Sequence, residues 1–295
     1  MNTIQKKSII YILIAAVLWG FSGVFFKELS VHGFSTMQVV FLRTSIATAM
    51  LGLWLLFKDR NAFHIKICDA WCFIGTGLFS LLLFNWSIYE AINLTGIAVS
   101  FVLLYTAPAF VAVFSAWLFR EKLRTFQWFI LILVLAGCAL VSGIIGVTDV
   151  NIKGILFGLS SGLGYALYSI FSRYALKRDY RPQTISFYTF ALCAAGSLLL
   201  SFIQVGNDFH LPVINPEVII FALALGSVGC VFPYWLYTKG LEHVPNAQAS
   251  MTATLEPVVA ATLGIFLYKE TLTVWQGLGA VLIIGSILLL SKEGS

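Results

Sequence analysis

The sequence predicts an all-α polytopic membrane protein: ten transmembrane helices as two inverted five-helix repeats, with both termini cytoplasmic. Three observations predict this class: an apolar composition, ten long apolar stretches and a weak internal repeat. Hydrophobic residues make up 59 % of the 295 residues and charged residues only 11 %, whereas soluble domains are about 25 % charged. Such a chain cannot cover a globule of its size with charged groups. This excludes a soluble enzyme, a nucleic-acid binder and a disordered scaffold.

Ten stretches are long and apolar enough to cross about 30 Å of hydrocarbon, which takes about 20 residues in a helix. They cover residues 8–26, 36–57, 70–91, 97–119, 126–145, 154–174, 183–204, 217–238, 247–268 and 274–290. Most connections are short, so neighbouring helices are predicted to be antiparallel. The first stretch follows two lysines, as in a signal peptide. Its length, Trp19 and the lack of a small-x-small cleavage site indicate an uncleaved span instead.

The distribution of Lys and Arg predicts the orientation. With the N-terminus in the cytoplasm, 14 of the 18 basic residues lie inside, 3 lie outside and Arg43 lies within a span. Cytoplasmic loops of membrane proteins carry an excess of Lys and Arg. The bias predicts a multi-pass protein of the plasma membrane with both termini inside, and the net charge of +5 then reflects orientation rather than affinity for nucleic acid.

The two halves of the chain resemble each other when they are aligned with a shift of 149 residues. Residues 70–140 then give 11 identities in 71 pairs, and a shift of 146 pairs Lys27 with Arg173. The matches among rare residue types are Trp86 with Trp235, Pro108 with Pro257, Glu121 with Glu270, and Gln127 with Gln276. Because each half has an odd number of spans, the copies must enter the bilayer from opposite sides, as in many secondary transporters. The predicted domains are residues 1–147 and 148–295.

Several short motifs lie within or beside these spans. In each half a proline is followed by a Glu-x-Leu sequence before the next span. The motifs are Trp19 to Ser22, Arg43, Thr106-Ala107-Pro108, Arg120-Glu121-Lys122-Leu123, Leu255-Glu256-Pro257 and Lys269-Glu270-Thr271-Leu272. With them, residues 8–290 resemble the drug/metabolite transporter superfamily, in its EamA-like ten-helix branch. The resemblance implies a small-molecule carrier, most often an exporter of metabolites or amino acids, and names no substrate.

Two ionisable side chains, Arg43 and Glu256, lie deep within predicted spans. Such a charge costs about 2.5–3.5 kcal/mol to insert, and it usually has a function. From the helical rise, the two lie at heights that differ by about 6 Å in a core of about 30 Å. We expect Glu256 to bind a cation or a proton, and Arg43 to bind a carboxylate or to balance Glu256. A structural ion pair, a helix-end hydrogen bond, or a backbone rearrangement at Pro257 that involves Glu256 explains the same residues.

Four aromatic residues lie deeper than the interfacial belt, and their rings would suit amphiphilic, aromatic or cationic substrates. Nearby amides and hydroxyls can add hydrogen bonds. The predicted substrate-binding residues are Trp19, Arg43, Asn85, Tyr105, Tyr165, Tyr168, Ser169, Thr252 and Glu256. Tight helix packing is the alternative explanation for each aromatic and hydroxyl residue. Pro108 and Pro257, at equivalent places, are predicted to shape a cavity and act as hinges, or else to form static kinks.

The expected function is secondary transport of a small amphiphilic metabolite, such as an amino acid or an amine, by alternating access. Export driven by the proton gradient, with Glu256 titrating, and simple exchange are both open. The four His lie in or beside loops and no Walker sequence is present, so no enzyme, metal or cofactor is predicted. The expected partners are a small-molecule substrate, the lipid bilayer and, for the driven case, protons. A non-transporting structural or assembly membrane protein is the alternative.

Overall fold

The structure is a computed structural model that describes residues 3–121, 123–145, 147, 151–205, 212–269, 271 and 273–293. Within these ranges the chain forms helices joined by short connections. The α-helices are α1 (Thr3–Val31), α2 (Thr36–Lys58), α3 (Ala70–Ile74), α4 (Leu83–Leu104), α5 (Ala107–Phe119), α6 (Thr125–Val141), α7 (Ile152–Leu176), α8 (Pro182–Val205), α9 (Pro216–Gly226), α10 (Phe232–Leu241), α11 (Asn246–Ala253), α12 (Leu255–Tyr268) and α13 (Val274–Glu293). The π-helical segments η3 (Gly75–Leu82) and η5 (Ser227–Val231) join α3 to α4 and α9 to α10. Of the motif residues, Lys122, Glu270 and Leu272 lie outside the described residues.

Much of the described chain lies in helical stretches that are long and apolar enough to cross a membrane. In the described residues there are 8 such stretches, and the shorter helices α5 and α6 are apolar as well. One stretch, Ile67–Leu104, covers 38 residues but is broken at Gly96, where φ is 79° and ψ is 172°. A positive φ of this size is accessible mainly to glycine. The chain therefore turns at Gly96, and residues 97–104 lead into α5.

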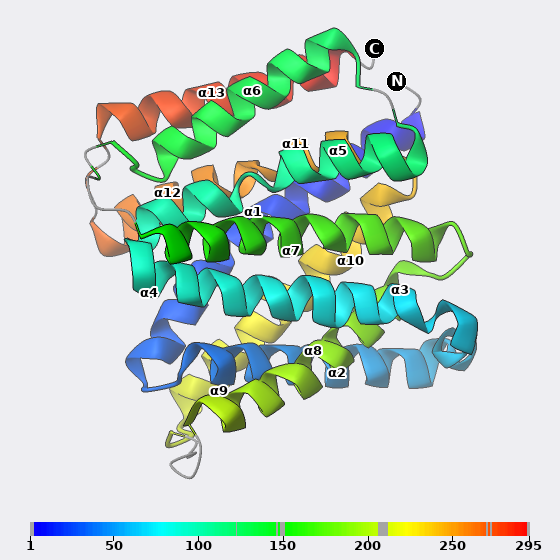
Figure 1. Cartoon of the computed structure of the whole chain (residues 1–295). Helices are drawn as coiled ribbons and strands as arrows, with labels where there is room; N and C mark the ends of the chain where they lie inside the picture. Colours follow the sequence, from blue (N-terminus) through cyan, green and yellow to red (C-terminus); the bar gives the residue numbers. More distant parts are fainter. Residues whose placement is uncertain are drawn as a thin grey trace.

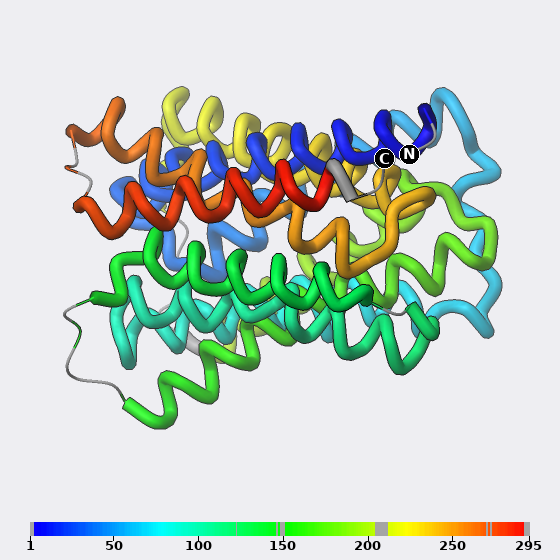
Figure 2. The backbone as a smooth tube through the Cα atoms, turned by 90° about the horizontal axis from the view of Figure 1, so that it is seen from above, coloured from blue at the N-terminus to red at the C-terminus, as the bar shows by residue number. Residues whose placement is uncertain are grey.

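The helices run roughly side by side, and both chain termini lie at the same end of the bundle (Figure 1). We call this the termini end, and the opposite end the far end. Seen from above, α1, α10 and α13 lie toward one face, and α5, α6 and α7 toward the other (Figure 2). The most extensive helix pairs are α4 with α7, α2 with α8, α6 with α13, and α1 with α10. In each pair one helix comes from each half of the chain, so the two halves are interleaved.

Close approach between the halves depends on small residues. A β-carbon at Gly137 in α6 would lie 2.8 Å from Ile283 Cγ1 and 3.0 Å from the Gly279 carbonyl oxygen in α13. A β-carbon at Gly162 in α7 would lie 2.8 Å from the Leu103 carbonyl oxygen in α4. Helices in a bilayer gain little from the hydrophobic effect between themselves, so such backbone contacts provide much of the packing.

Local backbone features recur in the two halves. Arg120 and Lys269 both end their helices with a left-handed conformation, with φ of 57° and 56°, and they are 149 residues apart in the sequence. Tyr105 and Thr254, also 149 apart, interrupt their helices with ψ of 8° and 3°. The π-helical segments η3 and η5 overlap under the same shift. The sequence repeat is therefore accompanied by a repeat of backbone conformation.

Ion pairs at both ends of the bundle link the two halves. At the far end His32 Nε2 lies 3.5 Å from Glu217 Oε2, and at the termini end Arg178 Nε lies 2.9 Å from Asp69 Oδ1. The backbone carbonyl of Glu28, and then the carboxylate of Glu217, raise the pKa of His32 above its ordinary value of 6.5. The ion pair between His32 and Glu217 therefore depends on pH.

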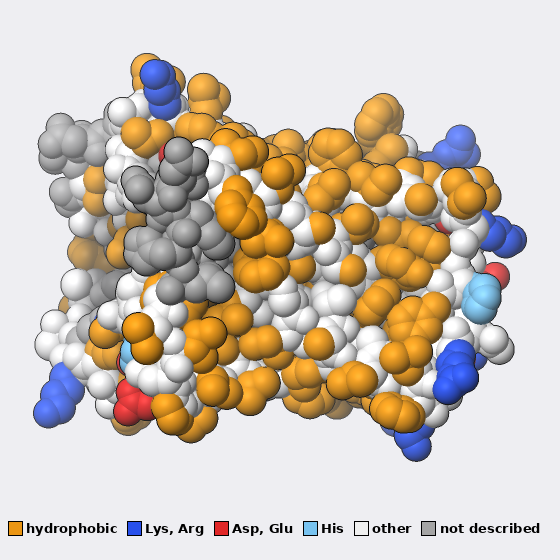
Figure 3. Space-filling view, turned by 90° about the horizontal axis from the view of Figure 1, so that it is seen from below, with side chains coloured by type: hydrophobic (Ala, Val, Ile, Leu, Met, Phe, Trp, Pro, Cys, Tyr) orange, Lys and Arg blue, Asp and Glu red, His pale blue; other side chains and the backbone are white. Residues whose placement is uncertain are grey.

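The outer surface of the bundle is apolar along its length. Hydrophobic side chains cover the flank between the two ends, and Lys and Arg side chains gather at the ends (Figure 3). Trp117 and Phe266, for example, are 76 % and 77 % exposed. Soluble monomers rarely expose contiguous apolar patches larger than a few hundred Å². The chain is therefore an integral membrane protein whose flank faces lipid.

Candidate functional site

One face of α7 carries three polar side chains that reach helices on the other side of the bundle interior. They are spaced four residues apart and therefore share a face. The Tyr165 hydroxyl donates to Glu256 Oε2 on α12 at 3.1 Å. Ser169 Oγ and the Tyr237 hydroxyl on α10 are 2.7 Å apart. Arg173, at the termini end of this face, belongs to a separate network described below.

A cluster of aromatic rings surrounds a small cavity at the level of Tyr165 and Ser169. The Trp19 ring in α1 contacts Tyr234, Tyr237 and Tyr165, with ring centroids 5.1, 5.3 and 6.2 Å apart. The cavity has a volume of about 10 Å³, which is room for about one water molecule. Its lining residues are Trp19, Ser80, Leu81, Phe84, Tyr165, Tyr168, Ser169, Tyr234 and Tyr237. The centre of the bundle is therefore occluded in this conformation, and we call this space the aromatic cavity.

Most hydroxyls that line the aromatic cavity have a hydrogen-bond partner, whereas the indole N–H of Trp19 has none among the described residues. The Tyr168 hydroxyl is 2.7 Å from Thr238 Oγ1. Trp19 is 8 % exposed, and its Nε1 has no hydrogen-bond partner among the described residues. Burying an unpaired donor is costly. An indole N–H in this state can donate to a ligand that enters the cavity.

Glu256 lies in the first turn of α12, immediately after the interruption at Thr254. A carboxylate is favoured at a helix N-terminus because the helix dipole and unpaired N–H groups are positive there. Pro257 and Pro108 both occupy the first turn of their helices, where the missing N–H of proline costs nothing. The helices are thus interrupted just before the prolines, and hinge motion at these places stays a prediction.

Arg43 and Asn85 form a second buried polar contact. Arg43 Nη2 donates to Asn85 Oδ1 at 2.7 Å, and Asn85 Nδ2 donates to the Leu81 carbonyl oxygen at 2.6 Å. Arg43 is 9 % exposed, and its Nε has no partner among the described residues. Of the two partners considered for Arg43, Glu256 is not in contact with it: in the described chain Glu256 is bonded to Tyr165 instead.

Five of the nine predicted site residues do not line the aromatic cavity: Arg43, Asn85 and Glu256, described above, and Tyr105 and Thr252. The Thr252 hydroxyl donates to the Gln248 carbonyl oxygen of its own helix at 2.8 Å. Tyr105 lines a different cavity of about 250 Å³ at the far end, which we call the vestibule. The vestibule lies between α4, α6, α12 and α13, and its lining residues are Ile97, Phe101, Tyr105, Val141, Ser142, Pro257, Ala260, Ala261, Ile265, Thr271 and Gln276. It reaches inward to Tyr105 and Pro257, next to Glu256 in the sequence.

Four of the predicted site residues, Trp19, Tyr165, Tyr168 and Ser169, line the aromatic cavity together, whereas the predicted set did not include Tyr234 or Tyr237, which also line it. The available signal was spacing, because Tyr237 follows Tyr234 by three residues and so shares its helix face. Whether these residues bind a substrate stays a prediction.

A polytopic bundle with interrupted helices and buried polar groups at mid-length has the architecture of a membrane transporter. The comparisons with known proteins agree. Two copies of the EamA-like transporter family model match residues 6–143 and 152–292. The chain belongs to the EamA-like transporter family, within the drug/metabolite transporter superfamily.

Relatives span most of the chain. An uncharacterized transporter of Archaeoglobus fulgidus is 30 % identical over 285 residues, covering 96 % of this chain and 95 % of the relative. The threonine/homoserine exporter RhtA of Escherichia coli K12 is 28 % identical over 216 residues, covering 71 % of this chain and 68 % of RhtA. One crystal structure superposes with a TM-score of 0.81 at 17 % identity, covering 98 % of this chain and 99 % of that one. That likeness concerns the fold alone.

Proposed function

We propose that the chain is a secondary transporter that exports a small amphiphilic metabolite, such as an amino acid or an amine, across the plasma membrane by alternating access. The observation that carries this proposal is the aromatic cavity. It lies between the halves of the chain, with Glu256 one hydrogen bond away through Tyr165. Relatives described as transporters support the class, and the name of RhtA supports amino acids and export.

The proposal includes ten spans in two inverted repeats, residues 1–147 and 148–295. Its support is the division of one long apolar stretch at Gly96, the two family matches and the backbone features that recur at a spacing of 149 residues. An odd number of spans in each half inverts the second half, and two inverted halves can exchange conformations. The excess of basic residues on one side supports cytoplasmic termini.

Glu256 is the proposed proton-binding group. A carboxyl at membrane depth is expensive as a charge, and its Tyr165 partner donates a hydrogen bond that favours the ionised form. Competition between a proton and a cationic substrate at one carboxylate would couple export of the substrate to entry of a proton. Arg43 and Trp19 Nε1, both with unpaired donors, are the proposed partners of a substrate carboxylate.

Counterflow in proteoliposomes tests the proposal. Vesicles loaded with unlabelled threonine, and separately with a primary amine, are diluted into the labelled compound. A carrier gives a transient, saturable accumulation of label above equilibrium. A current that does not saturate would indicate a channel. Absence of counterflow for amino acids and amines alike, with folded protein in the vesicles, would favour the structural alternative.

A further inference from the structure

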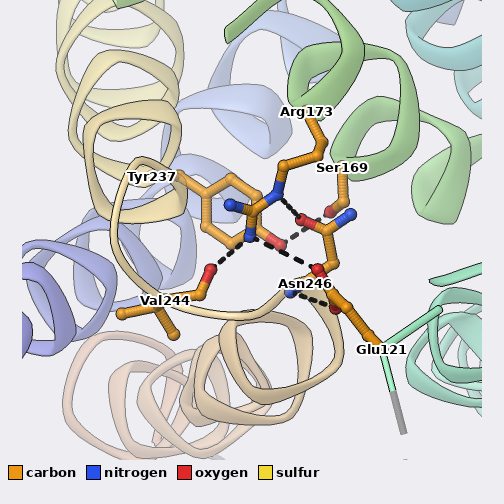
Figure 4. A network of polar contacts seen from close by, with 6 residues as sticks. All are labelled: Glu121, Ser169, Arg173, Tyr237, Val244 and Asn246. Carbon is orange, nitrogen blue, oxygen red and sulfur yellow. Dashed lines mark hydrogen bonds and ion pairs between the residues drawn. The ribbon is translucent and has the colours of Figure 1, made fainter. Parts of the chain in front are cut away.

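A network of polar contacts closes the termini end of the bundle (Figure 4). Arg173 Nε donates to Asn246 Oδ1 at 2.8 Å, and Arg173 Nη2 donates to the Val244 carbonyl oxygen. The Asn246 backbone N–H donates to Glu121 Oε2 at 3.1 Å. Arg173 Nη2 is also 3.9 Å from Glu121 Oε1. The network thus joins α7, the connection between α5 and α6, and the start of α11.

The hydrogen bonds through Asn246, rather than the charge pair, dominate this network. The distance of 3.9 Å between Arg173 and Glu121 is long for a charge-assisted hydrogen bond. Burial raises the pKa of Glu121, and Arg173 opposes that effect without overcoming it. The strongest links are therefore those that Arg173 makes to Asn246 and to the Val244 carbonyl.

The network lies directly beyond the aromatic cavity. Ser169 and Arg173 are four residues apart on one face of α7, a separation of about 6 Å along the helix. Ser169 and Tyr237 both line the cavity and contact each other at 2.7 Å. Figure 4 shows this pair beside the guanidinium of Arg173. A solute that leaves the cavity toward the termini end therefore meets Arg173 and its partners.

Two of the three equivalent places at the far end are built differently, and the third, Glu270, lies outside the described residues. Lys27 corresponds to Arg173 under the shift of 146 residues, and Ile97 corresponds to Asn246 under the shift of 149. Lys27 Nζ lies 3.4 Å from the centre of the Tyr268 ring. Ile97 carries no side-chain amide that could accept a hydrogen bond from Lys27. It is 66 % exposed and lines the vestibule. The termini end is thus closed by hydrogen bonds, while the far end holds a cavity of about 250 Å³.

We propose that Arg173, Asn246 and Glu121 form the gate of the termini end, and that this structure is an occluded state in which that gate is closed while the vestibule is open at the far end. The inference rests on the proposed function. In the transport cycle the gate opens when Arg173 releases Asn246 and the Val244 carbonyl, which frees the start of α11 from α7.

Thiol accessibility in sealed vesicles of known orientation tests this gate without any substrate. The five native cysteines are replaced, and a reporter is placed either beside the aromatic cavity (Ser169→Cys) or in the vestibule (Ala261→Cys). A membrane-impermeant thiol reagent is then applied from one side at a time. Labelling rates are compared with and without Arg173→Gln, with Asn246→Ala as a second way to break the network. Arg181→Gln, which removes an exposed ion pair with Asp59 at the same end, is the matched control.

Loss of charge-assisted hydrogen bonds is expected to raise labelling of Ser169→Cys from the termini side by about fivefold to tenfold. Labelling of Ala261→Cys from the far side should fall at the same time, and Arg181→Gln should change neither. Opposite changes at the two ends mark a gate. A rise at both reporters would show simple loosening, and unchanged rates with folded protein would also overturn the proposal. Unchanged labelling rates combined with intact counterflow would refute the proposed gate but not the proposed transport function.

Discussion

The unpaired indole N–H of Trp19 leads to a prediction in which stability and function change in different directions. Trp19→Phe keeps an aromatic ring beside Tyr165, Tyr234 and Tyr237 and removes only the Nε1 donor, which has no partner among the described residues. Removing an unsatisfied buried donor does not destabilise a fold. If a substrate accepts from Nε1, the variant loses one hydrogen bond of about 0.5–1.5 kcal/mol, which is about twofold to tenfold in affinity.

The assay measures the KM of transport in proteoliposomes together with the melting temperature of the purified protein. Trp19→Phe should raise KM by about twofold to tenfold and leave the melting temperature unchanged or higher. Trp19→Ala should also lower stability, because three ring contacts at about 0.5–1.5 kcal/mol each amount to about 1.5–4.5 kcal/mol. Trp54→Phe, at a tryptophan that is 44 % exposed, is the control. An unchanged KM in Trp19→Phe would refute a substrate contact at Nε1.

Three further predictions concern pH and packing. Glu256→Gln should abolish the pH dependence of transport while the protein stays folded, and an unchanged pH profile in liposomes would remove Glu256 as the proton site. Because the pKa of His32 is raised above 6.5, its pair with Glu217 should stabilise the fold fully below about pH 6.5 and stop doing so as the pH rises through the raised value. Glu217→Gln should therefore lower the melting temperature more at pH 6 than at pH 9, and an equal effect at both would contradict the pairing. Gly137→Ala should destabilise the protein because its β-carbon would lie 2.8 Å from a side chain, whereas Gly277→Ala meets nothing within 4 Å and should be tolerated; thermal unfolding that ranks the two equally would argue against the packing of α6 on α13.

The helical class could be predicted because membrane crossing imposes one requirement on every span. A stretch of about 20 apolar residues must form a helix to satisfy its backbone groups in lipid, and the predicted stretch 36–57 accordingly coincides with α2 (Thr36–Lys58). The turn at Gly96 lies in the gap between the predicted stretches 70–91 and 97–119. The interruptions at Tyr105 and Thr254 precede the prolines instead of following them, which hydropathy does not reveal. The π-helical segments were not predicted, since they arise from contacts between helices.

The candidate site was predicted less completely, because pairwise contacts depend on how the helices are arranged. Depth along a helix indicated that Arg43 and Glu256 are unusual, but it could not tell which helix faces them. In the structure Arg43 donates a hydrogen bond to Asn85, and Glu256 accepts one from Tyr165. Arg173 entered the sequence reasoning as one of the basic residues that set orientation and as the repeat partner of Lys27. Its contacts with Asn246 join residues 73 positions apart, and a single sequence holds no signal for that pairing.

The central claim is that the two halves move against each other around the aromatic cavity. A reversible block of the gate tests this most directly. Arg173→Cys and Asn246→Cys, in a background without native cysteines, are bridged by a short, reducible thiol cross-linker, and counterflow is measured before bridging, after bridging and after reduction. The account predicts that bridging stops counterflow and that reduction restores it to the level of the unbridged double variant. Counterflow that continues undiminished through a fully bridged protein would contradict alternating access at this end.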